Sequence, residues 1–132
     1  MEVLLVDDQP TTVQVFAANV RKTFGGARVH TAVDLPEALQ IASARPLDLV
    51  LLDLALPSCE GIEAVQRFHG AYPEVPILVL SATDDGDRIR ECIEAGACGY
   101  IPKTLAVAAL SDAMKLVASG GLYLPPRSPA VH

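Results

Sequence analysis

Five polar side chains in this chain each follow a short apolar stretch: three carboxylates, a hydroxyl and an amine. They are Asp7, Asp8, Asp53, Ser81 and Lys103. Carboxylates that are brought together repel one another, and this raises the pKa of each unless a cation compensates. A site made only of oxygen ligands suits Mg²⁺, which keeps several of its waters when it binds carboxylates. A carboxylate that also faces an ammonium group and a hydroxyl is arranged to accept a phosphoryl group and to hold its oxygens.

The elements that would position these side chains alternate along the chain. The sequence predicts strands over residues 3–6, 28–32, 49–52, 77–80 and 99–101. Each is followed by apolar residues at a spacing of about 3.6, which is typical of an amphipathic helix. Strict alternation of strand and helix predicts an α/β fold, a doubly wound five-stranded parallel sheet with helices on both faces. The usual strand order in such a sheet is 2-1-3-4-5.

This strand order predicts that the polar side chains meet at one edge of the sheet. The first and third strands are neighbours, so Asp7, Asp8 and Asp53 should meet at the switch point where such folds bind ligands. Ser81 and Lys103 follow later strands at the same edge. The alternative for the acidic pair alone is a strand-ending turn, but the presence of Asp53 and Lys103 favours a shared site.

Helix and domain boundaries follow from local signals. Asp34 with Glu37 three residues later is typical of an N-cap with a capping box, and Thr104 is the predicted cap of the last helix. From Ser119 onward glycine and proline recur, which a helix does not tolerate. We therefore expect one domain over residues 1–118 and a Gly/Pro-rich linker over residues 119–132, leading toward an output domain that is absent.

Charge and hydropathy narrow the classes of partner. The chain has 16 acidic and 10 basic residues, which gives a net charge of −6. DNA binding needs clustered Lys and Arg, and the basic residues here are scattered, which argues against direct DNA binding. No stretch approaches the roughly 20 apolar residues that a membrane span requires. The N-terminus turns acidic too early for a signal peptide. We therefore expect a cytoplasmic protein without a membrane partner.

With these motifs in this order, the chain resembles the receiver (CheY-like) domains of two-component response regulators over about residues 2–118. The resemblance rests on the Asp7-Asp8 pair, the run from Asp53 through Pro57 to Gly61, Ser81-Ala82, the approach from Gly96 to Tyr100, and Lys103. It implies a flavodoxin-like fold. The Gly-Gly-Leu-Tyr-Leu-Pro-Pro segment also resembles the one that precedes a helix-turn-helix output domain in NarL/FixJ-type regulators.

The resemblance implies a phosphoacceptor and a metal site. Asp53 would accept the phosphoryl group from a sensor histidine kinase. Asp8 and Asp53 would bind Mg²⁺ directly, Asp7 would act mainly through water, and the carbonyl of Ala55 would complete the protein ligands. Lys103 would pair with the phosphoryl group. Such a domain is not a turnover enzyme.

The resemblance also implies a switch. Ser81 would bind a phosphoryl oxygen and report that the site is occupied, and Tyr100 would then turn inward. The protein contacts that change would control transcription, with DNA bound only through the absent output domain. An Ala-rich last helix makes a homodimer on phosphorylation our expectation, through residues Ala106, Ala108, Ala109, Ala113 and Ala118.

Three positions depart from the family pattern. Gln9 stands where the family often has His, which we expect to matter little. Thr104 follows Lys103 where many receivers have proline, so the isomer of that peptide bond stays open. Ala55, two residues after Asp53, offers no side chain to orient water. Because neither Ala55 nor Thr83 carries a carboxamide or carboxylate to hold a water in line with an acyl phosphate, the sequence predicts slow self-dephosphorylation.

Two other functions compete with this interpretation. A phosphatase of the haloacid-dehalogenase kind also uses a strand-end Asp, Mg²⁺ and a Lys. It needs a second Asp where this chain has Ala55, and a cap domain for which the chain leaves no room. A scaffolding receiver that is not phosphorylated usually lacks one of the acidic residues or the Lys, and this chain has them all.

Overall fold

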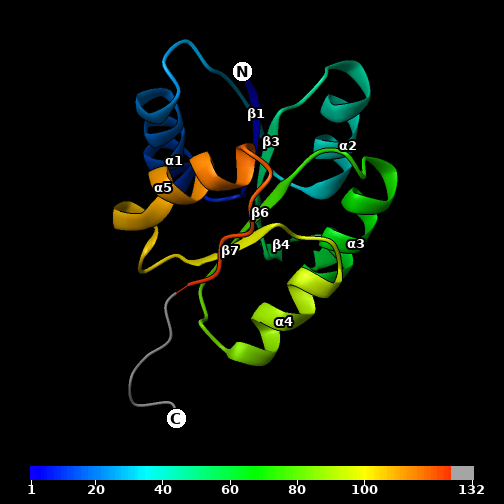
Figure 1. The fold of residues 1–132 in the computed structure, drawn as a ribbon. Helices are drawn as coiled ribbons and strands as arrows, with labels where there is room; N and C mark the ends of the chain where they lie inside the picture. The colour runs from blue at the N-terminus through cyan, green and yellow to red at the C-terminus, as the bar shows by residue number, and fades with distance from the viewer. Residues whose placement is uncertain (126–132) are drawn as a thin grey trace.

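The computed structural model describes residues 1–125, in which the five long strands alternate with helices along the chain (Figure 1). The elements are β1 (Glu2–Val6), α1 (Pro10–Thr23), β2 (Arg28–Ala32), α2 (Leu35–Ala44), β3 (Leu49–Asp53), β4 (Ala55–Leu56), β5 (Cys59–Glu60), α3 (Gly61–Ala71), β6 (Ile77–Ser81), α4 (Gly86–Glu94), β7 (Gly99–Pro102) and α5 (Ala106–Ala118). No helix in this part of the chain is both long and apolar enough to cross a membrane.

The main sheet has five parallel strands in the order β2-β1-β3-β6-β7. Counted among these five strands, this is the predicted order 2-1-3-4-5, and the doubly wound α/β fold is confirmed. Each predicted strand differs from the observed one by at most one residue at either end. The sequence did not predict the short antiparallel hairpin of β4 and β5, which directly follows β3.

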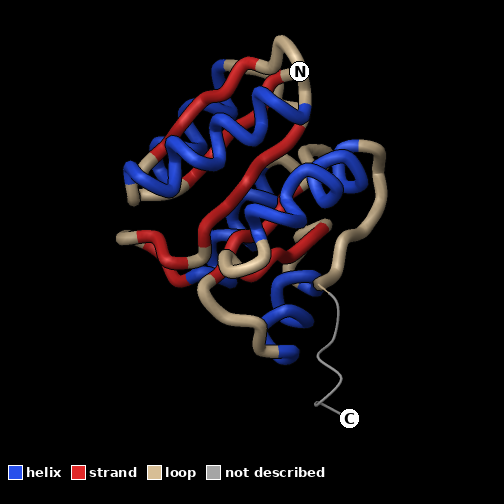
Figure 2. Tube along the Cα trace, turned by 90° about the vertical axis from the view of Figure 1, so that its left-hand side faces the viewer, coloured by secondary structure: helices blue, strands red, loops and turns tan. Residues whose placement is uncertain are grey.

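Helices cover both faces of the sheet and divide the core into two clusters. Helices α1 and α5 lie on one face, and α2, α3 and α4 lie on the other (Figure 1). Figure 2 views the molecule from the side of α1 and α5, with the strands behind them. Every residue of β3 and β6 is buried. Their sequences are accordingly apolar on both faces, as central strands of a parallel sheet require.

The N-cap prediction for α2 is confirmed, whereas that for α5 is wrong. The Asp34 carboxylate accepts a hydrogen bond from the Leu35 N–H at 2.8 Å, and Glu37 reaches back to the Val33 N–H at 2.9 Å. The residue before α5 is Leu105, and it makes no side-chain cap bond. Backbone bonds of the preceding turn, including Leu105 N–H to the Pro102 carbonyl at 2.9 Å, take the place of a cap.

Two glycines end α5 and turn the chain. Gly120 has a φ of 96°, a conformation that favours glycine. Its N–H donates to the Val117 carbonyl at 3.1 Å, and the Gly121 N–H donates to the Leu116 carbonyl at 2.9 Å. This pair of bonds is a Schellman motif. It directs the following residues back toward the sheet.

The segment after this turn lies along the edge of β7. Tyr123 pairs with Gly99 in a parallel bridge. The Tyr123 N–H donates to the Cys98 carbonyl at 3.0 Å, and the Tyr100 N–H donates to the Tyr123 carbonyl at 3.2 Å. The first part of the predicted linker is therefore paired with the sheet, and its residues 126–132 lie outside the described residues.

Candidate functional site

The three predicted carboxylates meet at the carboxyl edge of the sheet. Asp7 follows β1 and Asp53 ends β3, and these strands pair directly. Asp7, Asp8 and Asp53 each offer an oxygen within 4.8 Å of the others. Asp7 is 1% exposed and Asp53 is 2% exposed, whereas Asp8 faces solvent. The parallel topology thus brings two buried carboxylates and one accessible carboxylate to a single point.

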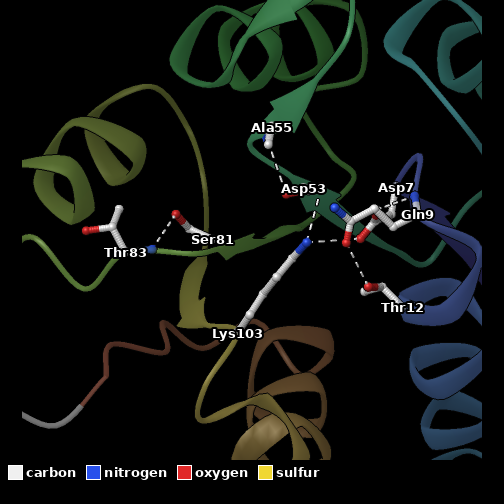
Figure 3. A network of polar contacts seen from close by, with 8 residues as sticks. All are labelled: Asp7, Gln9, Thr12, Asp53, Ala55, Ser81, Thr83 and Lys103. Carbon is white, nitrogen blue, oxygen red and sulfur yellow. Dashed lines mark hydrogen bonds and ion pairs between the residues drawn. The ribbon is translucent and has the colours of Figure 1, made fainter.

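Lys103 supplies the cation on the other side of this cluster (Figure 3). Its Nζ lies 3.3 Å from Asp7 Oδ2 and 3.3 Å from Asp53 Oδ2. Its backbone N–H donates to the Ser81 carbonyl, which ties the turn after β7 to the end of β6. One ammonium group thus faces two buried carboxylates, and the protein alone leaves an excess of negative charge.

The raised pKa of Asp7 reflects its burial first and the charge beside it second. Burial raises the pKa of the Asp7 carboxyl, and the neighbouring charge of Asp53 raises it further. The Gln9 N–H, which donates to Asp7 Oδ1 at 2.9 Å, and the Lys103 ammonium both lower the pKa, but they do not offset the burial. A divalent cation would remove the repulsion. The clustered carboxylate oxygens therefore fit a hard metal ion such as Mg²⁺.

The unpredicted hairpin orients Asp53. Ala55, the first residue of β4, donates its N–H to Asp53 Oδ1 at 3.2 Å. The second carboxylate oxygen, Oδ2, faces Lys103. Both oxygens therefore have a partner, and the carboxylate has a fixed direction. Ala55 itself is exposed, beside the opening of the site.

Ser81 lies at the end of β6, but its hydroxyl is turned away from Asp53. Its Oγ accepts a hydrogen bond from the Thr83 N–H at 3.3 Å. Figure 3 shows the hydroxyl directed toward Thr83 rather than toward the carboxylates. The structure therefore places Ser81 at the predicted edge, and contact with a group on Asp53 requires its side chain to rotate.

Tyr100 is fully buried on β7. Its hydroxyl donates to the Thr83 carbonyl at 2.7 Å, and burial raises the pKa of the phenol. Tyr100 already occupies the inward position that we expected phosphorylation to produce. Ser81 and Tyr100 hold opposite backbone groups of the same residue, Thr83. The described residues contain no cis peptide bond, so the Lys103–Thr104 bond is trans.

With this geometry established, comparison with known proteins shows the family. Residues 3–115 match the response regulator receiver domain. The chain belongs to this family. The match confirms the resemblance drawn from the sequence, and it disfavours the haloacid-dehalogenase alternative.

Among curated proteins, this receiver domain is similar to transcriptional regulators. It is 30% identical over 126 residues to the glycerol metabolism activator of Pseudomonas putida, with 95% of this chain and 57% of the relative covered. It is 30% identical over 131 residues to the transcriptional regulatory protein DegU of Brevibacillus brevis, with 96% of this chain and 54% of the relative covered. The chain thus spans little more than half the length of these relatives.

Solved structures agree with this family assignment. A two-component response regulator of the LuxR family from Aurantimonas sp. SI85-9A1 has a TM-score of 0.86 and 28% identity, covering 98% of this chain and 91% of that chain. A response regulator from Thermotoga maritima has a TM-score of 0.80 and 28% identity, covering 90% of this chain and 98% of that chain. The predicted resemblance to NarL/FixJ-type regulators is confirmed.

Proposed function

We propose that this receiver domain accepts a phosphoryl group on Asp53 from a sensor histidine kinase, with Mg²⁺, and thereby controls a transcriptional output domain. The observation that carries the proposal is the pairing of the buried Asp53 with Lys103 at 3.3 Å inside the carboxylate cluster. A buried carboxylate with a fixed direction and a nearby ammonium group suits nucleophilic attack on phosphorus.

Different residues of the chain have different roles in phosphoryl transfer. An oxygen of Asp53 forms the new bond to phosphorus while the bond to the donor's leaving group breaks. The Lys103 ammonium and the Ala55 N–H, which already contact the carboxylate, lie close enough to bind phosphoryl oxygens. Asp7, Asp8, Asp53 and the Ala55 carbonyl would hold Mg²⁺, which would neutralise charge on the phosphoryl group.

The switch that we propose runs through Thr83. A phosphoryl oxygen on Asp53 attracts the Ser81 hydroxyl, which then leaves the Thr83 N–H that it now contacts. Tyr100 holds the Thr83 carbonyl from the other side. The loop between β6 and α4 therefore has two arrangements, with Ser81 bound to Thr83 or to the phosphoryl group. The difference between these arrangements shifts the face formed by α4, β7 and α5 toward one of two conformations.

We propose that phosphorylation produces a homodimer and that any DNA contact is made by an output domain. The relative DegU, a transcriptional regulatory protein, is nearly twice as long as this chain. Among the alanines of α5, Ala106 and Ala113 are buried, Ala109 and Ala118 are half-buried and Ala108 is exposed, which favours an interface around Ala108. Light scattering before and after treatment with a phosphodonor should show a doubled mass, absent in Asp53→Asn. An unchanged mass would contradict the dimer.

We also propose that the domain acts in the cytoplasm without a membrane partner, and that it is modified once rather than turning over a substrate. Incubation with acetyl phosphate and Mg²⁺, followed by intact-mass measurement, tests the chemistry. One phosphoryl group should be added, and the addition should be lost in Asp53→Asn and in the presence of a chelator. Asp48→Asn, at the opposite end of β3, is the matched control and should be labelled normally. Labelling that survives Asp53→Asn would overturn the proposal.

A further inference from the structure

Gln9 lies at the opening of the carboxylate cluster, in the residue before α1. Its backbone N–H donates to Asp7 Oδ1 at 2.9 Å, which fixes its main chain to the site. The Thr12 hydroxyl donates to Gln9 Oε1 at 3.3 Å. Figure 3 shows the carboxamide directed toward the carboxylate cluster, beside Asp7 and on the side of the Lys103 ammonium. The side chain makes no helix-cap bond, so its placement serves no cap of α1.

The direction of hydrolysis makes this opening important. Asp53 is 2% exposed, so its carboxylate forms the floor of the site. When a phosphoryl group is bound there, the bond that hydrolysis must break points inward. A water attacking in line must therefore approach from the solvent side and must be held there. The side chains around the opening decide how well that water is held.

The exposed carboxylate of Asp8 belongs to the proposed metal site, and of three other exposed residues, Gln9, Ala55 and Thr83, one side chain suits this task. Ala55 offers only a methyl group. The Thr83 hydroxyl already accepts the Asp85 N–H at 3.1 Å. Gln9 carries a carboxamide, which has both a donor and an acceptor for a water molecule. The Thr12 hydroxyl limits the rotation of this carboxamide and so reduces the cost of ordering it.

We propose that Gln9 is a positioning residue for the hydrolysis of phosphoryl-Asp53 and sets the lifetime of the phosphorylated state. The oxygen of the held water forms a bond to phosphorus, and the bond from phosphorus to the Asp53 oxygen breaks. The electron pair of that bond returns to the carboxylate, a proton of the water passes to solvent, and inorganic phosphate leaves. This inference rests on the proposed function, and it replaces the expectation that Gln9 matters little.

The test is the rate at which labelled protein loses its phosphoryl group after the phosphodonor is removed, in Mg²⁺. Gln9→Leu keeps much of the side-chain volume without hydrogen bonding, and it should lengthen the lifetime by about tenfold, or about 1.4 kcal/mol. Thr12→Val removes the hydroxyl that anchors the carboxamide and should lengthen it by a smaller factor. Gln14→Leu, an exposed position on the same helix, is the matched control and should leave the lifetime unchanged.

Two further readouts separate positioning from a structural effect. The rate of labelling and the Mg²⁺ affinity should be the same in Gln9→Leu as in the wild type. An unchanged lifetime in Gln9→Leu, in a wild type that is labelled on Asp53, would overturn this inference alone. A lifetime that changes only together with Mg²⁺ affinity would also overturn it, since the substitution would then have disturbed the metal site. A wild type that takes up no phosphoryl group would instead refute the proposed function.

Discussion

The two ends of β1 carry acidic side chains in opposite electrostatic situations. At the amino end, Glu2 lies 2.7 Å from His30 Nε2 and 3.8 Å from Arg28 Nε, near solvent. The hydrogen bond to His30 is the main cause that lowers the pKa of Glu2. At the carboxyl end, burial raises the pKa of Asp7 although Lys103 is only 3.3 Å away.

The two ends therefore differ in role. The charged groups at the amino end stabilise the fold, whereas those at the carboxyl end form the candidate site. The ionised form is favoured for Glu2 at the start of this five-residue strand and disfavoured for Asp7 directly after its end. A buried carboxylate with too little compensation lowers the stability of the folded protein. Strained groups of this kind are typical of functional sites, where stability is exchanged for activity. The amino-end cluster has no such strain.

Removing a cation should lower stability much more at the carboxyl end of β1 than at its amino end. This is the largest difference that we expect between the two ends. Lys103→Met leaves Asp7 and Asp53 facing each other without a positive charge and should lower the free energy of unfolding by about 2 kcal/mol. Arg28→Met removes a largely exposed partner, 74% exposed at its side chain, and should change stability little. Urea denaturation at neutral pH without metal measures both. Equal losses at the two ends would contradict the contrast.

A carboxamide added near the carboxyl ends of the strands should change the lifetime of the phosphoryl group, whereas one added near their amino ends should not. Ala55→Asn places a second carboxamide beside Asp53 and should shorten the lifetime of the phosphoryl group, by up to about tenfold if it holds the attacking water. Ala44→Asn, at an exposed position at the end of α2, should leave the lifetime unchanged. The loss of label over time after donor removal gives both values. A lifetime that stays the same or lengthens in Ala55→Asn would count against a site limited by water positioning.

Neutralising the acid at each end should give small effects of opposite sign. The pKa of Asp7 is raised above 3.8, so the stability that its carboxyl contributes is lost as the pH rises through the raised value. Asp7→Asn should therefore be more stable than the metal-free wild type at neutral pH, by about 1 kcal/mol. The difference should close as the pH falls toward 3.8.

The pKa of Glu2 is lowered below 4.5, so the sign reverses. Its contribution is present above that value and is lost as the pH falls through the lowered one. Glu2→Gln should thus lose a little stability at neutral pH and none in acid. Thermal unfolding as a function of pH compares three curves, those of the wild type and of the two variants. A stabilising Glu2→Gln or a destabilising Asp7→Asn would show that the ends do not differ as described.

The sequence predicted the sheet well because its strands are covered on both faces. Apolar stretches such as residues 49–52 and 77–80 have sharp polar boundaries, and β3 and β6 extend only one residue further. The β4–β5 hairpin was missed because two-residue strands are too short to show a period. The spacing of Ile62, Val65 and His69 in the sequence predicts one face of α3. The buried residues there are Gly61, Ala64, Val65 and Phe68, so the apolar period alone placed the face imperfectly.

Within the site, positions that depend on topology were predictable and side-chain directions were not. Strand order brings Asp7 and Asp53 together whatever their neighbours do. The direction of the Ser81 hydroxyl depends on the backbone of Thr83, and the inward position of Tyr100 depends on the carbonyl of that same residue. The turn of Gln9 toward the site depends on Thr12. Such contacts depend on the local backbone path, which no residue pattern specifies.

We propose that Asp53, and neither Asp7 nor Asp8, forms the bond to phosphorus. Reduction of the labelled protein with borohydride converts an acyl phosphate on aspartate into homoserine, and peptide sequencing by mass spectrometry locates the changed residue. We expect homoserine at position 53, in one residue per chain, only when Mg²⁺ and phosphodonor are both present. Homoserine at position 7 or 8, or none in labelled protein, would contradict it.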